Sequence, residues 1–236
     1  MKPTTTPFPA ILTSSAASLR VELEDWSTLN DEGRGRVLTG LPANWRDTLD
    51  TDFVSFAHRH QLAPHRANSG ADWTTWLILG GRGAGKTRAG AEWVRDAALA
   101  DPRARIALIG ETEHDAREVM VEGVSGLLGV HRNDERPQWN ATRRRVEWKT
   151  GAVAQVFSAE NYEGLRGPQF SAAWLDELAK WRHAEATFDM LQFGLRLGER
   201  PRQVITTTAA ADRAHQAAYG RSAHGGDACR HAGQRL

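Results

Sequence analysis

The feature that most constrains this 236-residue chain is the loop Gly80-Gly81-Arg82-Gly83-Ala84-Gly85-Lys86-Thr87. The loop fits the pattern G-x-x-x-x-G-K-S/T, and it stands between the apolar run 75–79 and the helix-forming run 87–100. In that context, backbone N–H groups and the start of the helix both attract phosphate oxygens. The loop therefore predicts a phosphate-binding site, and the alternative is a plain glycine turn between a strand and a helix.

The residue types within the loop match what a triphosphate needs. Glycines let the backbone approach phosphate oxygens that side chains would otherwise block. Lys86 is predicted to reach the β- and γ-phosphates, and the hydroxyl of Thr87 is predicted to take one position on Mg²⁺. We therefore expect the whole loop to bind a nucleoside triphosphate together with Mg²⁺.

A second motif, Trp174-Leu175-Asp176-Glu177, distinguishes among the enzymes that carry such a loop. An apolar strand that ends in two acids brings Asp176 to the carboxyl edge of the sheet, where its carboxylate can hold the Mg²⁺ shell. Glu177 then remains to activate an attacking water, which favours an ATPase over a kinase. The alternative is a solvated acidic pair in the first turn of a helix.

Alternating apolar and helical runs predict an α/β fold. The strand 105–110 follows the helix 87–100 and completes a β-α-β unit. We therefore expect a mainly parallel sheet flanked by helices on both faces. Four further segments are predicted: a helical run at 112–130, a hairpin at 143–157 around Thr150-Gly151, a strand leading into a helix at 172–181, and a strand at 204–208.

The chain is predicted to divide into four parts. Residues 1–20 indicate a flexible leader, 21–70 a small helical segment and 71–208 the ATPase core. Residues 209–236 contain no Val, Ile, Phe, Trp or Met and predict a disordered tail. A one-base frameshift near the codon for Thr208 is the sharper hypothesis for this tail.

Composition excludes several classes of protein. A formal net charge of +1 neither favours nor excludes a nucleic-acid partner. Cys229 is the single cysteine, so the chain cannot form an internal disulfide or a cysteine-based zinc site, which fits the cytosol. No apolar run approaches the roughly 18 residues needed to span a membrane.

Three ordered stretches resemble the large terminase subunit of tailed phages, in the branch found in prophages and gene transfer agents. They are WLILGGRGAGKTRAGAEWVR, FSAENYEGLRGPQFSAAWLDELAKW and VITTT, within about residues 45–208. The resemblance implies a RecA-like P-loop ATPase of the additional-strand type in the cytoplasm of a bacterial host. It also implies a ring on the portal protein, with the small terminase subunit as a partner. Such a ring hydrolyses ATP and drives double-stranded DNA into a procapsid.

The resemblance also assigns roles to residues of the two motifs. Lys86 and Thr87 match the family's phosphate-loop residues, with Thr87 on Mg²⁺. Asp176 matches its metal carboxylate, and Glu177 matches its catalytic base. The chain ends where the family's nuclease domain begins, so we expect no nuclease activity from it.

The remaining matches each have an ordinary alternative. Arg82 matches a basic residue assigned to the γ-phosphate, and Arg166 matches an arginine finger that reaches a neighbouring subunit's ATP, but exposed loop arginines are common. Gln61 matches a glutamine that contacts adenine, and a surface glutamine at a helix end is equally ordinary. The run Thr206-Thr207-Thr208 matches a coupling motif that relays the γ-phosphate state to DNA-gripping parts, although β-branched residues also simply make a strand.

Other functions stay open at this point. Arg143-Arg144-Arg145 could contact DNA phosphates, but a charged strand on the solvated face of a hairpin is the preferred interpretation. The first rival function is a P-loop helicase or another DNA-stimulated ATPase unrelated to capsids. The second is a non-catalytic remnant that only binds nucleotide or partner subunits.

Overall fold

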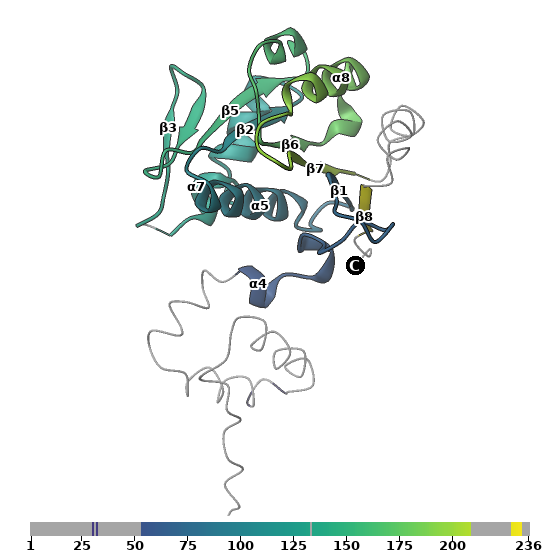
Figure 1. The fold of residues 1–236 in the computed structure, drawn as a ribbon. Helices are drawn as coiled ribbons and strands as arrows, with labels where there is room; N and C mark the ends of the chain where they lie inside the picture. Colours follow the sequence, from purple (N-terminus) through teal and green to yellow (C-terminus); the bar gives the residue numbers. More distant parts are fainter. Residues whose placement is uncertain (1–29, 31, 33–52, 133, 209–227, 233–236) are drawn as a thin grey trace, which may run out of the picture. The chain divides into compact units, whose positions relative to one another are not determined.

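The computed structural model of the chain describes residues 30, 32, 53–132, 134–208 and 228–232 (Figure 1). The predicted leader and most of residues 21–52 lie outside these described residues.

The chain divides into two units, Met1–His58 and Arg59–Leu236. The described part of the first unit contains the short helix α4 (Phe53–Phe56), and the helical segment expected at 21–70 stays a prediction. The amide of Ala57 donates a 2.8 Å hydrogen bond to the carbonyl of Phe53 and closes its single turn.

One sheet organises the second unit, and its strands lie in the order β3-β4-β5-β2-β6-β7-β1-β8. Neighbouring strands from β5 to β8 run parallel, whereas β3 and β4 extend the sheet in antiparallel fashion. The mainly parallel sheet of the sequence prediction is therefore confirmed. The strands are β1 (Thr75–Leu79), β2 (Arg105–Gly110), β3 (Gln138–Asn140), β4 (Arg145–Glu147), β5 (Val153–Ser158), β6 (Ala172–Asp176), β7 (Arg202–Thr207) and β8 (Ala228–Ala232).

Helices cover both faces of this sheet. The long helix α5 packs beside α7 on one face, and α8 lies on the other (Figure 1). The segment η4 is a π-helix, in which the amide of Glu122 donates to the carbonyl of Arg117 five residues earlier at 2.9 Å. The described helices of the second unit are η3 (Arg59–Gln61), α5 (Lys86–Ala100), α6 (Glu113–Asp115), η4 (Ala116–Val121), α7 (Leu127–Val130), η5 (Tyr162–Leu165), η6 (Leu178–Lys180) and α8 (Ala184–Gly194).

The core follows from the two-residue period of the strands. Side chains at alternate positions of one strand face opposite sides of the sheet, so each central strand needs apolar residues throughout. On the face of α8, Leu175 and Ile205 pack in one cluster with Phe188 and Leu191 of that helix. Trp174 and Val204 are just as completely buried, and the alternation places them on the face of α5.

Several predicted segments differ from the structure in detail. The hairpin at 143–157 forms from β4 and β5, and β3 adds a strand that the sequence pattern did not predict. The helical run at 112–130 is divided into α6, the π-helix and α7. The strand within 172–181 leads into a short 3-10 helix, and the regular helix begins only at Ala184.

The last described segment, β8, lies within the part of the chain for which composition indicated no strand. It pairs in parallel with β1 over its whole length, from Thr75 opposite Ala228 to Leu79 opposite Ala232. The other residues of 209–236 lie outside the described part of the chain. Among the described helices, none is long and apolar enough to cross a bilayer.

Candidate active site

The two sequence motifs meet at the carboxyl edge of the parallel sheet. β7 lies between β1, which leads into the glycine loop, and β6, which ends in the acids. In register, Leu79 of β1 is opposite Thr207, and Asp176 of β6 is opposite Thr206. The threonine run therefore separates the loop from the acids and touches both.

The glycine loop has the backbone that its sequence requires. Gly83 and Gly85 have φ values of 78° and 70°, in the left-handed region that glycine adopts without strain. A Cβ on Gly80 would lie 2.8 Å from that of Ala84, so the loop closes too tightly there for a side chain. Lys86 is buried, and its Nζ donates hydrogen bonds to the carbonyls of Gly80 (3.1 Å) and Gly81 (3.0 Å).

The helix η3 supports the loop from the other side. Gln61 Nε2 donates to the carbonyl of Gly85 at 3.3 Å, and His60 Nε2 lies 2.9 Å from the carbonyl of Ala84. Since a carbonyl only accepts, His60 Nε2 carries the proton of that bond. Gln61 thus lies beside the loop, and its contact with adenine stays a prediction. His60 was missed, and its only sequence signal is that it precedes Gln61.

Asp176 is a buried carboxylate, with 8% of the residue exposed. The hydroxyl of Thr206 donates to its Oδ1 at 2.6 Å. Burial raises the pKa of Asp176 to about 6, while the Thr206 hydrogen bond and the Lys86 charge oppose that rise. A carboxylate held this way gains from a cation that replaces the lost water.

Glu177 stands at a bend where the strand ends. Its backbone is left-handed, with φ 51° and ψ 39°, which is strained for a residue other than glycine. Its amide donates to the carbonyl of Thr206 at 2.7 Å and holds this bend against β7. As a result Glu177 turns its carboxylate toward the glycine loop, where Oε1 lies 3.5 Å from Lys86 Nζ.

The three threonines have three different partners around these acids. Thr206 bonds to Asp176, and the hydroxyl of Thr208 donates to Glu177 Oε2 at 2.7 Å. Thr207 accepts a 3.1 Å hydrogen bond from the amide of Ala179 in η6. Lys180 Nζ lies 3.8 Å from Glu177 Oε2. The sequence had not predicted a role for this lysine. The threonine run therefore orients the whole segment that carries the acids.

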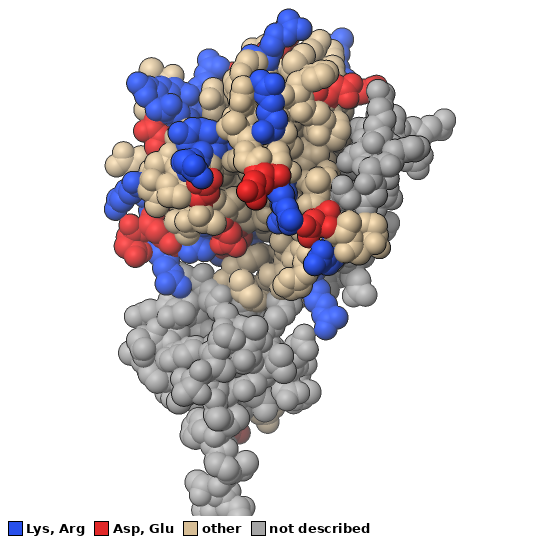
Figure 2. Space-filling view, in the orientation of Figure 1, with Lys and Arg blue, Asp and Glu red and all other residues tan. Residues whose placement is uncertain are grey.

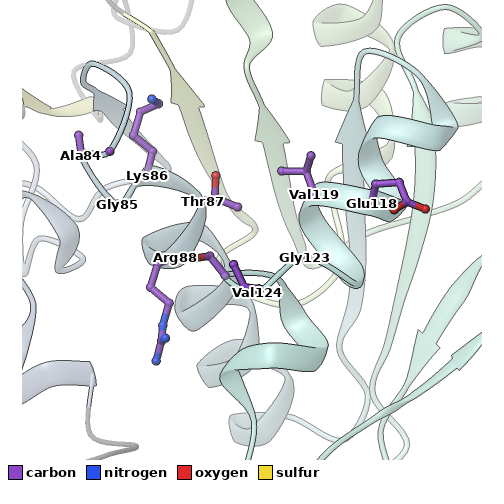
Figure 3. A pocket seen from close by; sticks show the side chains of 11 residues that line it. Ala84, Gly85, Lys86, Thr87, Arg88, Glu118, Val119, Gly123 and Val124 are labelled. Carbon is purple, nitrogen blue, oxygen red and sulfur yellow. The ribbon is translucent and has the colours of Figure 1, made fainter.

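Two cavities flank Thr87 at the start of α5. The larger, about 430 Å³, lies between the loop and the segment from Glu118 to Ser125 (Figure 3). The smaller, about 270 Å³, is lined by Thr87, Asp176 and Glu177. The π-helix contributes Val119 to both cavities. Figure 3 shows Lys86 and Arg88 pointing in opposite directions from the start of α5.

The smaller cavity has a donor set that suits Mg²⁺. Its walls offer the hydroxyl of Thr87 and the buried carboxylate of Asp176. Within the described residues, no group of three or more His, Cys, Asp or Glu is arranged to hold a metal by itself. Magnesium bound with a nucleotide takes only one or two protein ligands and completes its shell with phosphates and water, so the residues fit.

The two predicted arginines are exposed, and the structure places neither in the walls of these cavities. Arg82 lies at the tip of the loop. Arg166 follows η5, and its guanidinium is 3.8 Å from the carboxylate of Glu163.

Two of the three basic residues in the run 143–145 pair with acids. Arg144 pairs with Glu113, and Arg145 pairs with Glu147. The face drawn in Figure 2 likewise mixes basic and acidic side chains. These pairs reduce the positive charge that the run would offer to DNA.

Comparison with solved structures finds the same fold in phage packaging proteins. The large terminase of a thermophilic bacteriophage superposes with a TM-score of 0.57 at 12% identity, over 68% of this chain and 40% of that one. The large terminase of bacteriophage HK97 gives 0.54 at 16%, over 81% and 39%. The N-terminal domain of the DNA packaging ATPase of bacteriophage phi29 gives 0.54 at 14%, over 70% and 92%.

This chain therefore spans about 40% of the length of the thermophilic phage protein. No curated protein matches its sequence. Residues 77–220, more than half of the chain, match the family model described as terminase large subunit, T4likevirus-type, N-terminal. The α/β P-loop fold agrees with that match, and the match over more than half of the chain shows that the chain belongs to the family of terminase large subunits.

Proposed function

We propose that this chain is the motor ATPase of a terminase and that it hydrolyses Mg²⁺·ATP to move double-stranded DNA into a procapsid. The observation that carries the proposal is the convergence on Glu177. Lys86 of the glycine loop and Thr208 of the threonine run both contact its carboxylate. The site thus joins a phosphate loop, an acid and a strand that can respond to both.

The proposed chemistry divides among the chain's own residues. Lys86 binds the β- and γ-phosphates, and the loop amides from Gly80 to Thr87 bind the remaining phosphate oxygens. Thr87 and Asp176 would hold Mg²⁺, which neutralises charge that develops on the transferred phosphoryl group. Glu177 accepts a proton from the attacking water, because its carboxylate lies at the cavity wall beside Lys86.

Coupling to DNA is proposed to run through Thr206-Thr207-Thr208. These residues end β7 and bond to both acids and to the amide of Ala179. A shift of the acids on phosphate release would therefore displace the end of β7. We infer that this displacement reaches the parts of the motor that grip DNA.

Two exposed arginines and one glutamine complete the proposed site. We infer that Arg82 contacts the γ-phosphate from the loop and that Arg166 reaches the ATP of a neighbouring subunit in a ring. Arg166 is suited to that role because 73% of its side chain is exposed and Gly167 beside it has φ 109°. Gln61 contacts adenine from its position against Gly85.

The proposed assembly is a ring on the portal protein, with the small terminase subunit as a further partner, in the cytoplasm of a bacterial host. We infer that the chain belongs to the prophage and gene transfer agent branch, which the three stretches quoted above resemble, and the loop sequence GGRGAGKT argues against an unrelated helicase. A structure of the thermophilic phage terminase in complex with ATP-gamma-S has the same fold (TM-score 0.57, 12% identity) and supports ATP as the nucleotide.

An ATPase assay with and without double-stranded DNA tests the proposal. We expect Mg²⁺-dependent hydrolysis that DNA stimulates, and Glu177→Gln should bind ATP but lower kcat by about 100-fold or more. Glu199→Gln, at an exposed glutamate outside both cavities, is the matched control and should keep the parental rate. Strand separation on a forked duplex would support a helicase instead, and ATP binding without turnover would indicate a non-catalytic remnant.

A further inference from the structure

Trp174 lies directly beneath the acids and is one of the most completely buried side chains, with 0% of the residue exposed. Its Nε1 donates a 3.0 Å hydrogen bond to the hydroxyl of Thr206. That hydroxyl is in turn 2.6 Å from Asp176 Oδ1. The three side chains therefore form a chain of hydrogen bonds that begins in the core and ends at the carboxylate.

The number of protons on each group determines which group donates in each of these hydrogen bonds. An indole N–H can only donate, so Trp174 occupies a lone pair of the Thr206 oxygen and leaves its single proton free to be donated. Two acceptors compete for that proton, the carbonyl of Leu175 at 3.2 Å and Asp176 Oδ1 at 2.6 Å. The carboxylate is the closer and the charged acceptor, so it takes the bond.

The bond sets which way the carboxylate of Asp176 faces. Trp181 Nε1 donates to the main-chain carbonyl of Asp176 at 3.1 Å and fixes the backbone there. The remaining freedom is rotation of the side chain, and the Thr206 bond holds Oδ1 toward β7. In the described part of the chain, Oδ2 accepts no hydrogen bond, and the residue lines the smaller cavity.

The helix α5 leaves room for the indole at one position. A Cβ on Gly90 would lie 2.3 Å from Cε2 and 2.5 Å from Nε1 of Trp174. Any larger residue at 90 would therefore push the ring away from Thr206. The same helix begins with Lys86 and Thr87, so the contact also couples the position of the ring to the end of the glycine loop.

We propose that Trp174 is a positioning residue for the metal-binding carboxylate: it aims the Thr206 hydroxyl at Oδ1 of Asp176 and so presents Oδ2 to a divalent cation. The inference rests on the proposed function, because it assumes that a nucleotide brings that cation to the smaller cavity. A purely structural role for Trp174 would require only the bulk of the ring and would not depend on its N–H.

The test compares nucleotide affinity in EDTA with affinity in Mg²⁺, using a fluorescent ADP analogue and the whole chain. Trp174→Phe keeps an aromatic ring and removes the N–H. We expect its affinity in EDTA to stay within about twofold of the parent and its gain from Mg²⁺ to fall by about fivefold, since a lost hydrogen bond changes binding by roughly that factor. Trp148→Phe is the matched control, because Trp148 is a buried indole that donates to His131 instead.

Two further replacements keep the inference testable if the Phe variant does not fold. Benzothienylalanine at 174 retains the bicyclic shape without the N–H and should lose the same Mg²⁺ gain. Thr206→Val should lose it as well, whereas Thr206→Ser, which keeps the hydroxyl, should retain it.

The outcomes separate the inference from the function on which it rests. A parental chain whose nucleotide affinity does not respond to Mg²⁺ overturns the proposed function, and with it the inference. If Mg²⁺ raises the nucleotide affinity of the parent, and Trp174→Phe or the benzothienyl replacement keeps that increase in full, only the role of Trp174 is overturned. If the replacements at Trp174 lose the increase in affinity with Mg²⁺ and Trp148→Phe retains it, the inference is supported.

Discussion

The hydroxyl of Thr208 donates a 2.7 Å hydrogen bond to Oε2 of Glu177, and Lys86 Nζ lies 3.5 Å from the other oxygen of the same carboxylate. The acid is thus held between the end of the threonine run and the base of the glycine loop. Because Glu177 also has a left-handed backbone, its orientation depends on these contacts more than on local preference.

Removing the Thr208 hydroxyl should therefore misplace Glu177. We expect Thr208→Val to lower kcat by about tenfold, since hydrogen bonds to a charged group contribute about 1.5–3 kcal/mol. Nucleotide affinity should stay within about twofold of the parent. Steady-state ATPase kinetics check the first expectation, and Thr208→Ser should restore the rate. An unchanged kcat in Thr208→Val would show that the hydroxyl does not orient the acid.

The two lysines that approach Glu177 should differ in their effect on catalysis, because one is buried and the other is exposed. Lys86 has 8% of its side chain exposed and Lys180 has 59%, although both lie within 4 Å of the carboxylate. We expect Lys86→Gln to lower kcat/KM by about 100-fold, because a preorganised charge in a site that excludes water strongly stabilises the charge of the transition state. Lys180→Gln should change it by less than about twofold, as for other exposed ion pairs. Equal losses in the two variants would contradict this ranking.

Gly85 should tolerate no side chain. Its φ is 70°, and a Cβ there would lie 2.0 Å from Gln61 Nε2, so the Gln61 side chain would have to move and give up its hydrogen bond to the Gly85 carbonyl. We expect Gly85→Ala to lose nucleotide binding and to lower the free energy of unfolding by more than the roughly 1–2 kcal/mol of the backbone strain alone. Gly70→Ala is the control, because Gly70 has φ 84° and open space around its Cα. Thermal unfolding and ADP titration of both variants measure the difference.

His131 should make stability depend on pH. Its Nδ1 lies 2.6 Å from the carbonyl of Leu127, and its Nε2 accepts the N–H of Trp148 at 2.8 Å, so both nitrogens are used by the neutral ring. Burial lowers the pKa of His131, and the charges of Arg95 and Arg136 lower it further, while the Leu127 carbonyl and Glu135 oppose them.

The sign of the effect follows from that lowered pKa. The unfolded chain binds a proton at about pH 6.5 and the folded chain only at lower pH, so this stabilisation is complete above pH 6.5 and is lost as the pH falls below it. The slope reaches at most about 1.4 kcal/mol per pH unit. Urea unfolding from pH 7.5 to 5 should show this loss of stability in the parent, and the contribution of His131 should be missing from the profile of His131→Gln. Parallel profiles for the two proteins would be inconsistent with this role.

The parallel core could be predicted because its strands are continuous apolar runs. The runs 75–79 and 105–110 form β1 and β2 with those bounds, since a strand buried on both faces needs no alternation and ends where polar or glycine residues begin. The glycine loop between β1 and α5 was equally clear, because its pattern fixes a glycine at Gly85, which is left-handed; Gly83, at a variable position of the pattern, is left-handed as well.

The segment after Asp176 could not be predicted from local pattern. The sequence ELAKW predicts a helix, but the amide of Glu177 donates to the carbonyl of Thr206, 29 residues later in β7. That long-range bond holds Glu177 in the left-handed region, so only a 3-10 turn follows and the regular helix starts at Ala184. The π-helix at Ala116–Val121 was missed for a related reason, because a widened turn does not change which residues are apolar.

The sequence also could not predict which residues contact one another in the candidate site. A run of three threonines predicts a strand, but alternation sends Thr206 and Thr208 to one side and Thr207 to the other. Only the register with β6 shows that Thr206 meets Asp176. His60 and Lys180 have no motif of their own, and their contacts with the loop and with Glu177 come from packing.

The position of β7 between β1 and β6 sets a dimension of the site. Adjacent strands lie about 4.8 Å apart, so the glycine loop and the acids start from strands about 9.6 Å apart. Neighbouring strands would bring a phosphate group and the acid backbone into the same space. The intervening strand works as a spacer: it leaves a gap wide enough for a phosphoryl group and a water molecule, which the long side chains of Lys86 and Glu177 then bridge.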